Sequence, residues 1–327
     1  MGGRVSETEA VDVFDHNNRS ERTTQNKMSE QTGQRLEGDG QPSSVTLTPP
    51  GDPLPTPRAP LTSPWTPRDI LLAALFLSVM SFVGVAVRVL LADEFKANFL
   101  GSFLMGLFQT ASLKTAFPYS HMGLTVGLCG SLTTFSLWTY SAVKAYDQSF
   151  LNFLGEIIVG LTTPFMFFFV GRDLGMWLPP VPSRVATFFC DVLILLIGVC
   201  FQILLMSVLP YEDIFTCCLG PFGAGLRYML GVNFNPIHPK YQIGTLLANV
   251  LGVCIVGALE SHPGRWSKNV MTGFCGSLST VSSWVNDTIK DYQQSKAWGY
   301  FYCISSVVVC VTIAEVALML GKRMNEQ

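Results

Sequence analysis

The sequence predicts an all-α membrane protein with nine transmembrane helices, arranged as two inverted four-helix halves joined by one linker helix. Apolar residues make up 49% of the chain and charged residues only 13%. After about residue 68 the apolar runs are long and the breaks between them are short, which a water-soluble core does not need. In addition, a polar, glycine-rich phrase within these apolar surroundings occurs twice.

The repeated phrase defines the two halves. Residues 127–138 (GLCGSLTTFSLW) return as residues 273–284 (GFCGSLSTVSSW), with eight identical positions in twelve. Each copy follows an Asn-x-x-Gly pattern, which begins at Asn98 in the first half and at Asn249 in the second. This order indicates a duplicated membrane unit with a site at mid-depth in the bilayer.

Nine apolar segments are each near the ~20 residues that a membrane-spanning helix needs. They lie at 69–92, 95–113, 120–143, 150–171, 185–209, 216–233, 241–260, 268–286 and 297–320. By the repeat, segments one to four match segments six to nine, and the fifth stands alone. Because four crossings alone would return the second copy in the same orientation, the fifth crossing inverts it and gives an inverted repeat.

The domain organisation follows from these segments. We expect a polar tail (1–66), a first four-helix repeat (67–178), a linker with one transmembrane helix (179–212), a second four-helix repeat (213–323) and a short tail (324–327). The first tail is rich in Ser, Thr, Gln, Gly and Pro, and this composition predicts disorder. Lys and Arg in the short loops are nearly equal on the two sides, with a slight excess that favours a cytoplasmic N-terminus.

The third helix of each half is expected to be broken. Gly127 and Gly130, followed by two threonines and a serine, weaken a helix and expose backbone carbonyls, and the second copy does the same. Unsatisfied backbone at membrane depth is tolerated only where it lines a cavity or holds an ion. Small residues that merely allow close helix packing are the alternative. The recurrence of the Thr/Ser core favours a functional break.

Asn98 and Asn249 each place a carboxamide in mid-bilayer, which is costly without a partner. An inter-helix hydrogen bond is the usual use of such a residue. Recurrence of the asparagine one turn before a glycine in both halves favours a donor that lines a path.

Charged residues are rare in the apolar segments. We expect Arg88 and Arg227 to lie near helix ends and to extend their head groups to the interface. Asp287 and Glu156 are further vestibule or structural charges, and Glu156 could pair with an arginine. With a net charge of -2 and no cluster of Lys and Arg, nucleic acid is not an expected partner.

The repeated motifs resemble those of a known membrane-protein family. Asn-x-x-Gly in a second helix, then Gly-x-x-Gly-x-x-Thr-Thr-Phe-Ser in a third, resembles the Fluc/CrcB fluoride channels. The four-plus-one-plus-four layout resembles their fused eukaryotic form, the fluoride exporter (FEX) proteins. The resemblance covers about 68–323. It implies a fluoride-selective channel that exports F⁻ passively and protects the cell from fluoride toxicity.

The resemblance also implies a location, a cofactor and an assembly. We expect a multi-pass protein of the lipid bilayer, in a eukaryotic plasma membrane, that works as a monomer containing both halves. In the family, two antiparallel four-helix units carry fluoride through narrow paired pores, and a central sodium ion sits on carbonyls of the broken helices. The sodium-facing carbonyls here would be those of Gly130, Thr133, Gly276 and Ser279.

Pore positions carry over in the same way. Phe135 falls on the first pore phenylalanine and Trp138 on the second, and Val281 and Trp284 take these positions in the second half. The other residues assigned to the fluoride path are Asn98, Thr134, Ser136, Asn249, Thr280 and Ser282. Because each pore of the family takes its aromatics from opposite units, one pore would hold Phe135 with Trp284 and the other Val281 with Trp138. We expect the first pore to conduct and the second to be impaired.

These groups suit fluoride, which is small, strongly hydrated and a strong hydrogen-bond acceptor. Amides and hydroxyls donate without a fixed positive charge that would trap the ion, and aromatic edges carry partial positive charge. A proton-coupled secondary exporter, with Glu156 or Glu315 as proton carriers, is the alternative. An enzyme is not expected, because the chain lacks a GxSxG elbow and paired metal-ligand histidines.

Overall fold

The structure is a computed structural model that describes residues 66–110, 118–177 and 184–325. Every regular element in these ranges is helical, which confirms the predicted all-α class. The predicted polar tail lies outside the described residues except for Thr66. This residue caps the first helix, α2, in a capping box with Asp69, in which each side chain accepts a hydrogen bond from the other residue's backbone N–H.

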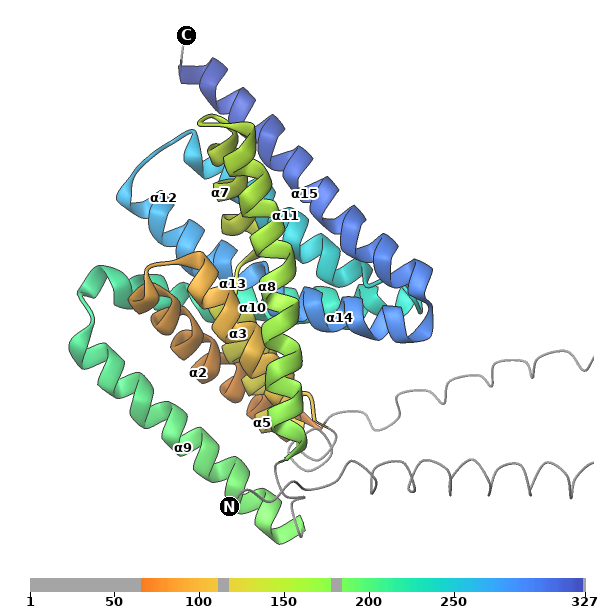
Figure 1. The fold of residues 1–327 in the computed structure, drawn as a ribbon. Helices are drawn as coiled ribbons and strands as arrows, with labels where there is room; N and C mark the ends of the chain where they lie inside the picture. Colours follow the sequence, from red (N-terminus) through yellow and green to blue (C-terminus); the bar gives the residue numbers. More distant parts are fainter. Residues whose placement is uncertain (1–65, 111–117, 178–183, 326–327) are drawn as a thin grey trace, which may run out of the picture. The chain divides into compact units, whose positions relative to one another are not determined.

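The first half contains four principal segments, seen from orange to light green in Figure 1. They are α2 (Pro67–Leu91), α3 (Glu94–Phe108), the interrupted third segment, and α8 (Phe150–Met176) after it. The third segment consists of α5 (Pro118–Met122), the π-helix η1 (Gly123–Cys129), α6 (Gly130–Leu132) and, beyond a break, α7 (Phe135–Tyr146). The break that the sequence predicts therefore lies at Thr133 and Thr134.

The linker and the second half continue the chain. They comprise α9 (Arg184–Val208), α10 (Tyr211–Phe234), the 3₁₀-helix η2 (Asn235–Ile237), α11 (Ile243–Glu260), α12 (Arg265–Val270), the π-helix η3 (Met271–Cys275), α13 (Gly276–Leu278), α14 (Val281–Gln294) and α15 (Lys296–Asn325). Here the break lies at Ser279 and Thr280. Both broken segments thus share one order, a π-helix, a single short α-turn, two extended residues and a longer helix.

Five of the described helices are long and apolar enough to cross a membrane, namely α2, α8, α9, α11 and α15. They differ in their surroundings. Most of the apolar stretch of α2 is buried inside the protein, whereas α8, α9 and α15 leave large apolar side chains exposed along their length. Exposed apolar helices of this kind suit contact with lipid.

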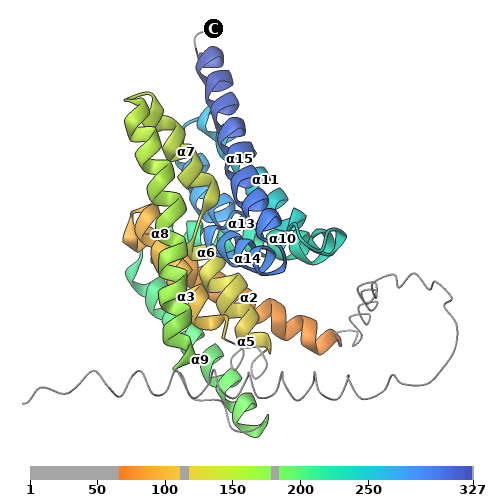
Figure 2. The ribbon, with the colours of Figure 1, turned by 45° about the vertical axis from the view of Figure 1, so that its right-hand side comes forward.

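The centre of the described fold is formed by the first helices of the two halves together with the broken segments. α2 packs against α10 and against η1, and α10 packs against η3 and α13. Close approach is needed here, because a Cβ added at Gly84 would lie 2.6 Å from the Leu128 carbonyl oxygen. One at Gly223 would lie 2.3 Å from the Phe274 carbonyl oxygen. Around this centre, α3 lies along α8 and α11 lies along α15 (Figure 2).

Candidate functional site

The two breaks meet each other in the protein interior. Thr133 has φ -88° and ψ 152°, and Ser279 has φ -88° and ψ 153°, so both are extended residues of nearly identical geometry. The turns before them, α6 and α13, are in contact. All four break residues are fully buried.

Each break caps the helix that follows the other break. The Thr133 hydroxyl accepts the backbone N–H of Ser282 at 3.2 Å and lies 3.0 Å from the Ser282 hydroxyl. Reciprocally, the Ser279 hydroxyl accepts the backbone N–H of Ser136 at 3.0 Å and lies 2.8 Å from the Ser136 hydroxyl. A side-chain oxygen on a free N–H near a helix start is an N-cap interaction, here supplied across the two halves.

The two asparagines hold the breaks open. Asn98 Oδ1 accepts the Thr134 N–H at 2.8 Å, and its Nδ2 donates to the Thr134 carbonyl at 3.2 Å. Asn249 makes the same pair of bonds with Thr280, at 2.8 Å and 3.4 Å. The usual inter-helix use of a buried asparagine is therefore present, and the expected path-lining role rests on the second hydrogen of each amide nitrogen.

These asparagines also change what the backbone carbonyls can accept. In a continuous α-helix each carbonyl accepts the N–H four residues on. The Thr134 N–H, which would serve the Gly130 carbonyl, donates to Asn98 instead. The Leu137 N–H, which would serve the Thr133 carbonyl, donates to the Thr134 hydroxyl at 3.3 Å.

The second break repeats this redirection. The Thr280 N–H donates to Asn249 rather than to the Gly276 carbonyl. The Ser283 N–H donates to the Thr280 hydroxyl at 3.3 Å rather than to the Ser279 carbonyl. The four carbonyls that the resemblance assigns to sodium have thus lost their helical donors, and oxygen ligands of this kind fit a hard cation.

The two arginines are buried, so the expectation that they extend to the interface is wrong. Arg88 Nη2 donates to the Thr272 carbonyl at 2.5 Å, and Arg227 Nη2 donates to the Val126 carbonyl at 2.7 Å. The acceptors are equivalent positions of the two repeats, each on the broken segment of the opposite half. A π-helix leaves carbonyls poorly matched to its own N–H groups, and these guanidinium groups provide donors for them.

The aromatic residues gather in one buried group. The Phe135 ring contacts Trp138 at 5.1 Å and Trp284 at 5.3 Å between centroids, both edge-on at 77°. The two tryptophans are themselves 6.4 Å apart, and Val281 is buried in the same cluster. Phe135 therefore lies against Trp284, which the resemblance assigns to the same pore, and equally against Trp138, which it assigns to the other pore.

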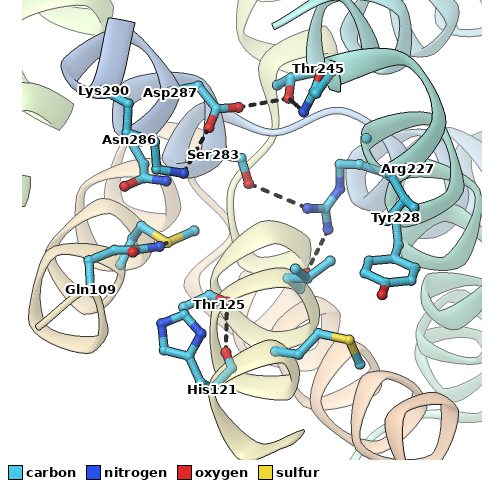
Figure 3. A pocket seen from close by; sticks show the side chains of 16 residues that line it. Gln109, His121, Thr125, Arg227, Tyr228, Thr245, Ser283, Asn286, Asp287 and Lys290 are labelled. Atoms are coloured by element: carbon cyan, nitrogen blue, oxygen red, sulfur yellow. Dashed lines mark hydrogen bonds and ion pairs between the residues drawn. The ribbon is translucent and has the colours of Figure 1, made fainter. Parts of the chain in front are cut away.

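Two polar cavities lie at the arginines. The cavity at Arg227 has a volume of about 340 Å³ and contains Ser283, Asp287 and Lys290 (Figure 3). Asp287 accepts the Thr245 hydroxyl at 2.7 Å and pairs with Lys290 at 3.3 Å. Asp287, which the sequence suggests as a vestibule or structural charge, therefore lies in the lining of this cavity.

The cavity at Arg88, of about 400 Å³, has Leu137 where the first has Ser283. Its lining also includes Asp93, Glu94 and Lys268. Hydrogen bonds from the backbone N–H of Lys96, above all, hold the pKa of the Asp93 carboxyl below its ordinary value. The Asp93 carboxylate is therefore ionised at neutral pH, and it shares the lining of this cavity with Arg88 and Lys268.

Glu156 is not brought to the breaks. Its carboxylate lies at a separate polar cavity beside Lys144 and Asn152, and the ion pairs found among the described residues do not include it. Sequence reasoning missed Ser102 and Thr245. Ser102 directly follows the glycine of the first Asn-x-x-Gly pattern, and its counterpart is Val253, so a comparison of the two copies could have singled it out.

The chain is similar to known proteins over both broken segments. The family model described as CrcB-like protein, Camphor Resistance (CrcB), matches residues 75–172 and again residues 214–321. The two matches contain both asparagines, both breaks and both arginines. No solved structure matches the chain.

Some relatives align with one half of this chain, and others align with both halves. The "Fluoride-specific ion channel FluC" of Haemophilus influenzae (strain PittGG) is 33% identical over 98 residues, which cover 28% of this chain and 76% of the relative. That of Mannheimia succiniciproducens is 31% identical over 112 residues, 32% of this chain and 87% of the relative. The "Fluoride export protein 1" of Candida albicans is 26% identical over 250 residues, 64% of this chain and 62% of the relative.

Proposed function

The chain belongs to the CrcB family, and on this premise we propose that it is a fluoride-selective ion channel. It exports fluoride passively across the plasma membrane and so protects the cell from fluoride toxicity. The observation that carries the proposal is the double family match, which places one copy of the broken segment in each half. The relatives named as fluoride channels and a fluoride export protein agree with it.

We further propose that nine helices cross the bilayer and that the halves are inverted. The C-terminal ends of α8 and α15, the last helices of the two halves, point in opposite directions in Figures 1 and 2, which supports this. An inverted pair brings equivalent residues together around one axis. The reciprocal bonds between Thr133 and Ser282, and between Ser279 and Ser136, have this form.

The broken segments supply opposite partial charges at mid-depth. Helices α7 and α14 begin at the breaks, and a helix N-terminus carries partial positive charge that favours an anion. The short turns before the breaks end there with their carbonyls, which favour a cation. Fluoride therefore passes the N-terminal end of α7 or α14, where amide, hydroxyl and aromatic-edge donors lie. A cation is held next to this path by the carbonyls.

We propose that a structural sodium ion is bound by the carbonyls of Gly130, Thr133, Gly276 and Ser279. The redirected N–H groups described above support the fit. When bound, the ion supplies positive potential close to the fluoride path without lying in it. The protein's own part is to hold these carbonyls apart from their helical donors, and Asn98 and Asn249 do this.

One of the two routes is proposed to conduct. Helix α3, with Asn98 and Ser102, packs against α14, which carries Trp284. Helix α11, which has Val253 in place of Ser102, packs against α7. The first route thus has a hydroxyl and an aromatic ring where the second has apolar side chains, since Val281 also replaces Phe135 there.

The proposal is tested by ion efflux from liposomes that contain the purified full-length chain. Fluoride should leave under an applied membrane voltage, chloride should be retained, and a pH gradient should not change the rate. Equal efflux of both ions would remove the selectivity. Efflux that follows the pH gradient would instead favour the alternative, a proton-coupled exporter.

A further inference from the structure

We propose that the indole N–H of Trp284 is a direct fluoride ligand, and that the two repeats differ in a way that leaves this indole without a protein partner while its counterpart Trp138 is bonded. The proposal rests on the proposed function, because it names a donor within the route already assigned to Phe135 and Trp284. The proposal adds a hydrogen-bond donor at a position that otherwise contributes only an aromatic ring edge to the route.

Trp284 is buried and its polar atom is unused. The side chain is 0% exposed, and Nε1 has no hydrogen-bond partner in the part of the chain that the structure describes. Its ring instead meets the edges or faces of other aromatic rings, Phe135 at 5.3 Å and Phe165 at 5.4 Å. A buried N–H without an acceptor costs free energy, so a buried indole normally finds a partner.

The equivalent tryptophan of the first half does find one. Trp138 Nε1 donates to the backbone carbonyl of Glu156 on α8 at 3.2 Å. The approach depends on Gly160, one turn later, because a Cβ at that position would lie 2.1 Å from Trp138 Nε1. The indole therefore occupies the space that a larger residue would fill.

The second half has lost this arrangement through one residue. The patterns Tyr146-x-Gln-Ser and Tyr292-x-Gln-Ser align the two halves without a gap into α8 and α15. In that alignment Tyr302 stands for Glu156 and Ser306 stands for Gly160. The Ser306 hydroxyl donates to the Tyr302 carbonyl at 2.6 Å. The Ser306 hydroxyl therefore engages the carbonyl equivalent to the one that Trp138 uses, and the Trp284 N–H has no partner among the described residues.

A second unused donor lies on the helix that faces this tryptophan's helix. Ser102, on α3, is fully buried and its hydroxyl has no partner among the described residues, and α3 packs against α14. Its counterpart, Val253, is apolar and fully buried. The packed pair α3 and α14 thus carries two buried donors, Ser102 and Trp284, without partners among the described residues, whereas their counterparts are apolar (Val253) or bonded (Trp138).

The chemistry of the ion fits these donors. Hydrogen bonds to a charged acceptor are shorter and about twice as strong as those between neutral groups. Fluoride concentrates one charge on a small atom, so a buried N–H beside the route can replace one of the hydrogen bonds that the ion loses with its hydration shell.

The experiment observes the indole N–H directly in the unmodified protein. The full-length chain is labelled with ¹⁵N at its six tryptophans and titrated in micelles with sodium fluoride, and separately with sodium chloride at the same sodium concentration. Trp284→Phe assigns the Trp284 resonance by its loss. We expect that resonance to move downfield and saturate with fluoride only, while the Trp138 resonance, whose N–H is already bonded, stays in place.

Liposome efflux provides the second readout. Trp284→Phe keeps an aromatic ring and removes the donor, so fluoride efflux should fall on the order of tenfold, the effect of one hydrogen bond to a charged group. The matched control is Trp266→Phe, on an exposed surface tryptophan, which should leave efflux unchanged. If the wild type carries fluoride but its Trp284 resonance ignores the ion, the inference is overturned. If the wild type carries no fluoride, the proposed function fails instead.

Discussion

Removing the Ser279 hydroxyl should destabilise the protein more than removing the hydroxyl of Ser277, two residues earlier in the chain. Ser279 Oγ accepts the Ser136 N–H at 3.0 Å, lies 2.8 Å from the Ser136 hydroxyl and donates to the Cys275 carbonyl at 3.0 Å. In Ser279→Ala the Ser136 N–H remains fully buried without its acceptor. An orphaned donor costs about 1–3 kcal/mol, and loss of an N-cap side chain costs about 0.5–2 kcal/mol.

We therefore expect Ser279→Ala to lose about 2 kcal/mol of unfolding free energy, roughly a 30-fold change in the unfolding equilibrium constant. The assay is titration of the purified protein in micelles with a denaturing detergent, followed by tryptophan fluorescence. Ser277→Ala is the matched control. Its side chain is also fully buried, but its hydroxyl has no partner among the described residues, so the loss should stay below about 0.5 kcal/mol. Equal losses in the two variants would refute the cross-capping.

Two further predictions concern the arginines and the cation. Gly130→Ala should cost about 1–3 kcal/mol, because its Cβ would lie 2.3 Å from the Arg227 guanidinium, which is held by the Ser277 and Val126 carbonyls. Gly155→Ala, where a Cβ meets nothing within 4 Å, should be neutral or stabilising in the same titration. Replacing sodium by N-methylglucamine should lower stability by about 1.4 kcal/mol if sodium is at ten times its Kd, and an unchanged midpoint would speak against the sodium site.

The breaks could be predicted because their cause is local. Glycines and hydroxyl residues weaken a membrane helix wherever they occur. Because the glycine and hydroxyl pattern occurs twice in the chain, it predicts where both breaks lie. The all-α class followed from the long apolar runs in the same way. The predicted tail lies outside the described residues, apart from its last residue.

The contacts of each side chain could not be predicted from the sequence in the same way, because they depend on which residues of other segments pack against it. Asn98 was expected to line the path. The sequence pattern did not identify the Thr134 backbone, on another segment, as its hydrogen-bond partner. The glycine of that pattern has its own role, since a Cβ at Gly101 would lie 2.4 Å from the Thr133 methyl group. The arginines were expected at the interface because hydropathy does not reveal a π-helix with carbonyls to satisfy. Only the alignment of the two copies, read beside the contacts, exposes the difference between Gly160 and Ser306.

The most direct test of a single selective route is a side-by-side measurement of fluoride efflux from liposomes with Phe135→Ile and with Trp138→Ile. Phe135 touches both tryptophans and lies on the proposed route, whereas the Trp138 indole is bonded to α8. We predict that Phe135→Ile abolishes efflux and that Trp138→Ile keeps most of it. Equal loss in the two variants would contradict the account.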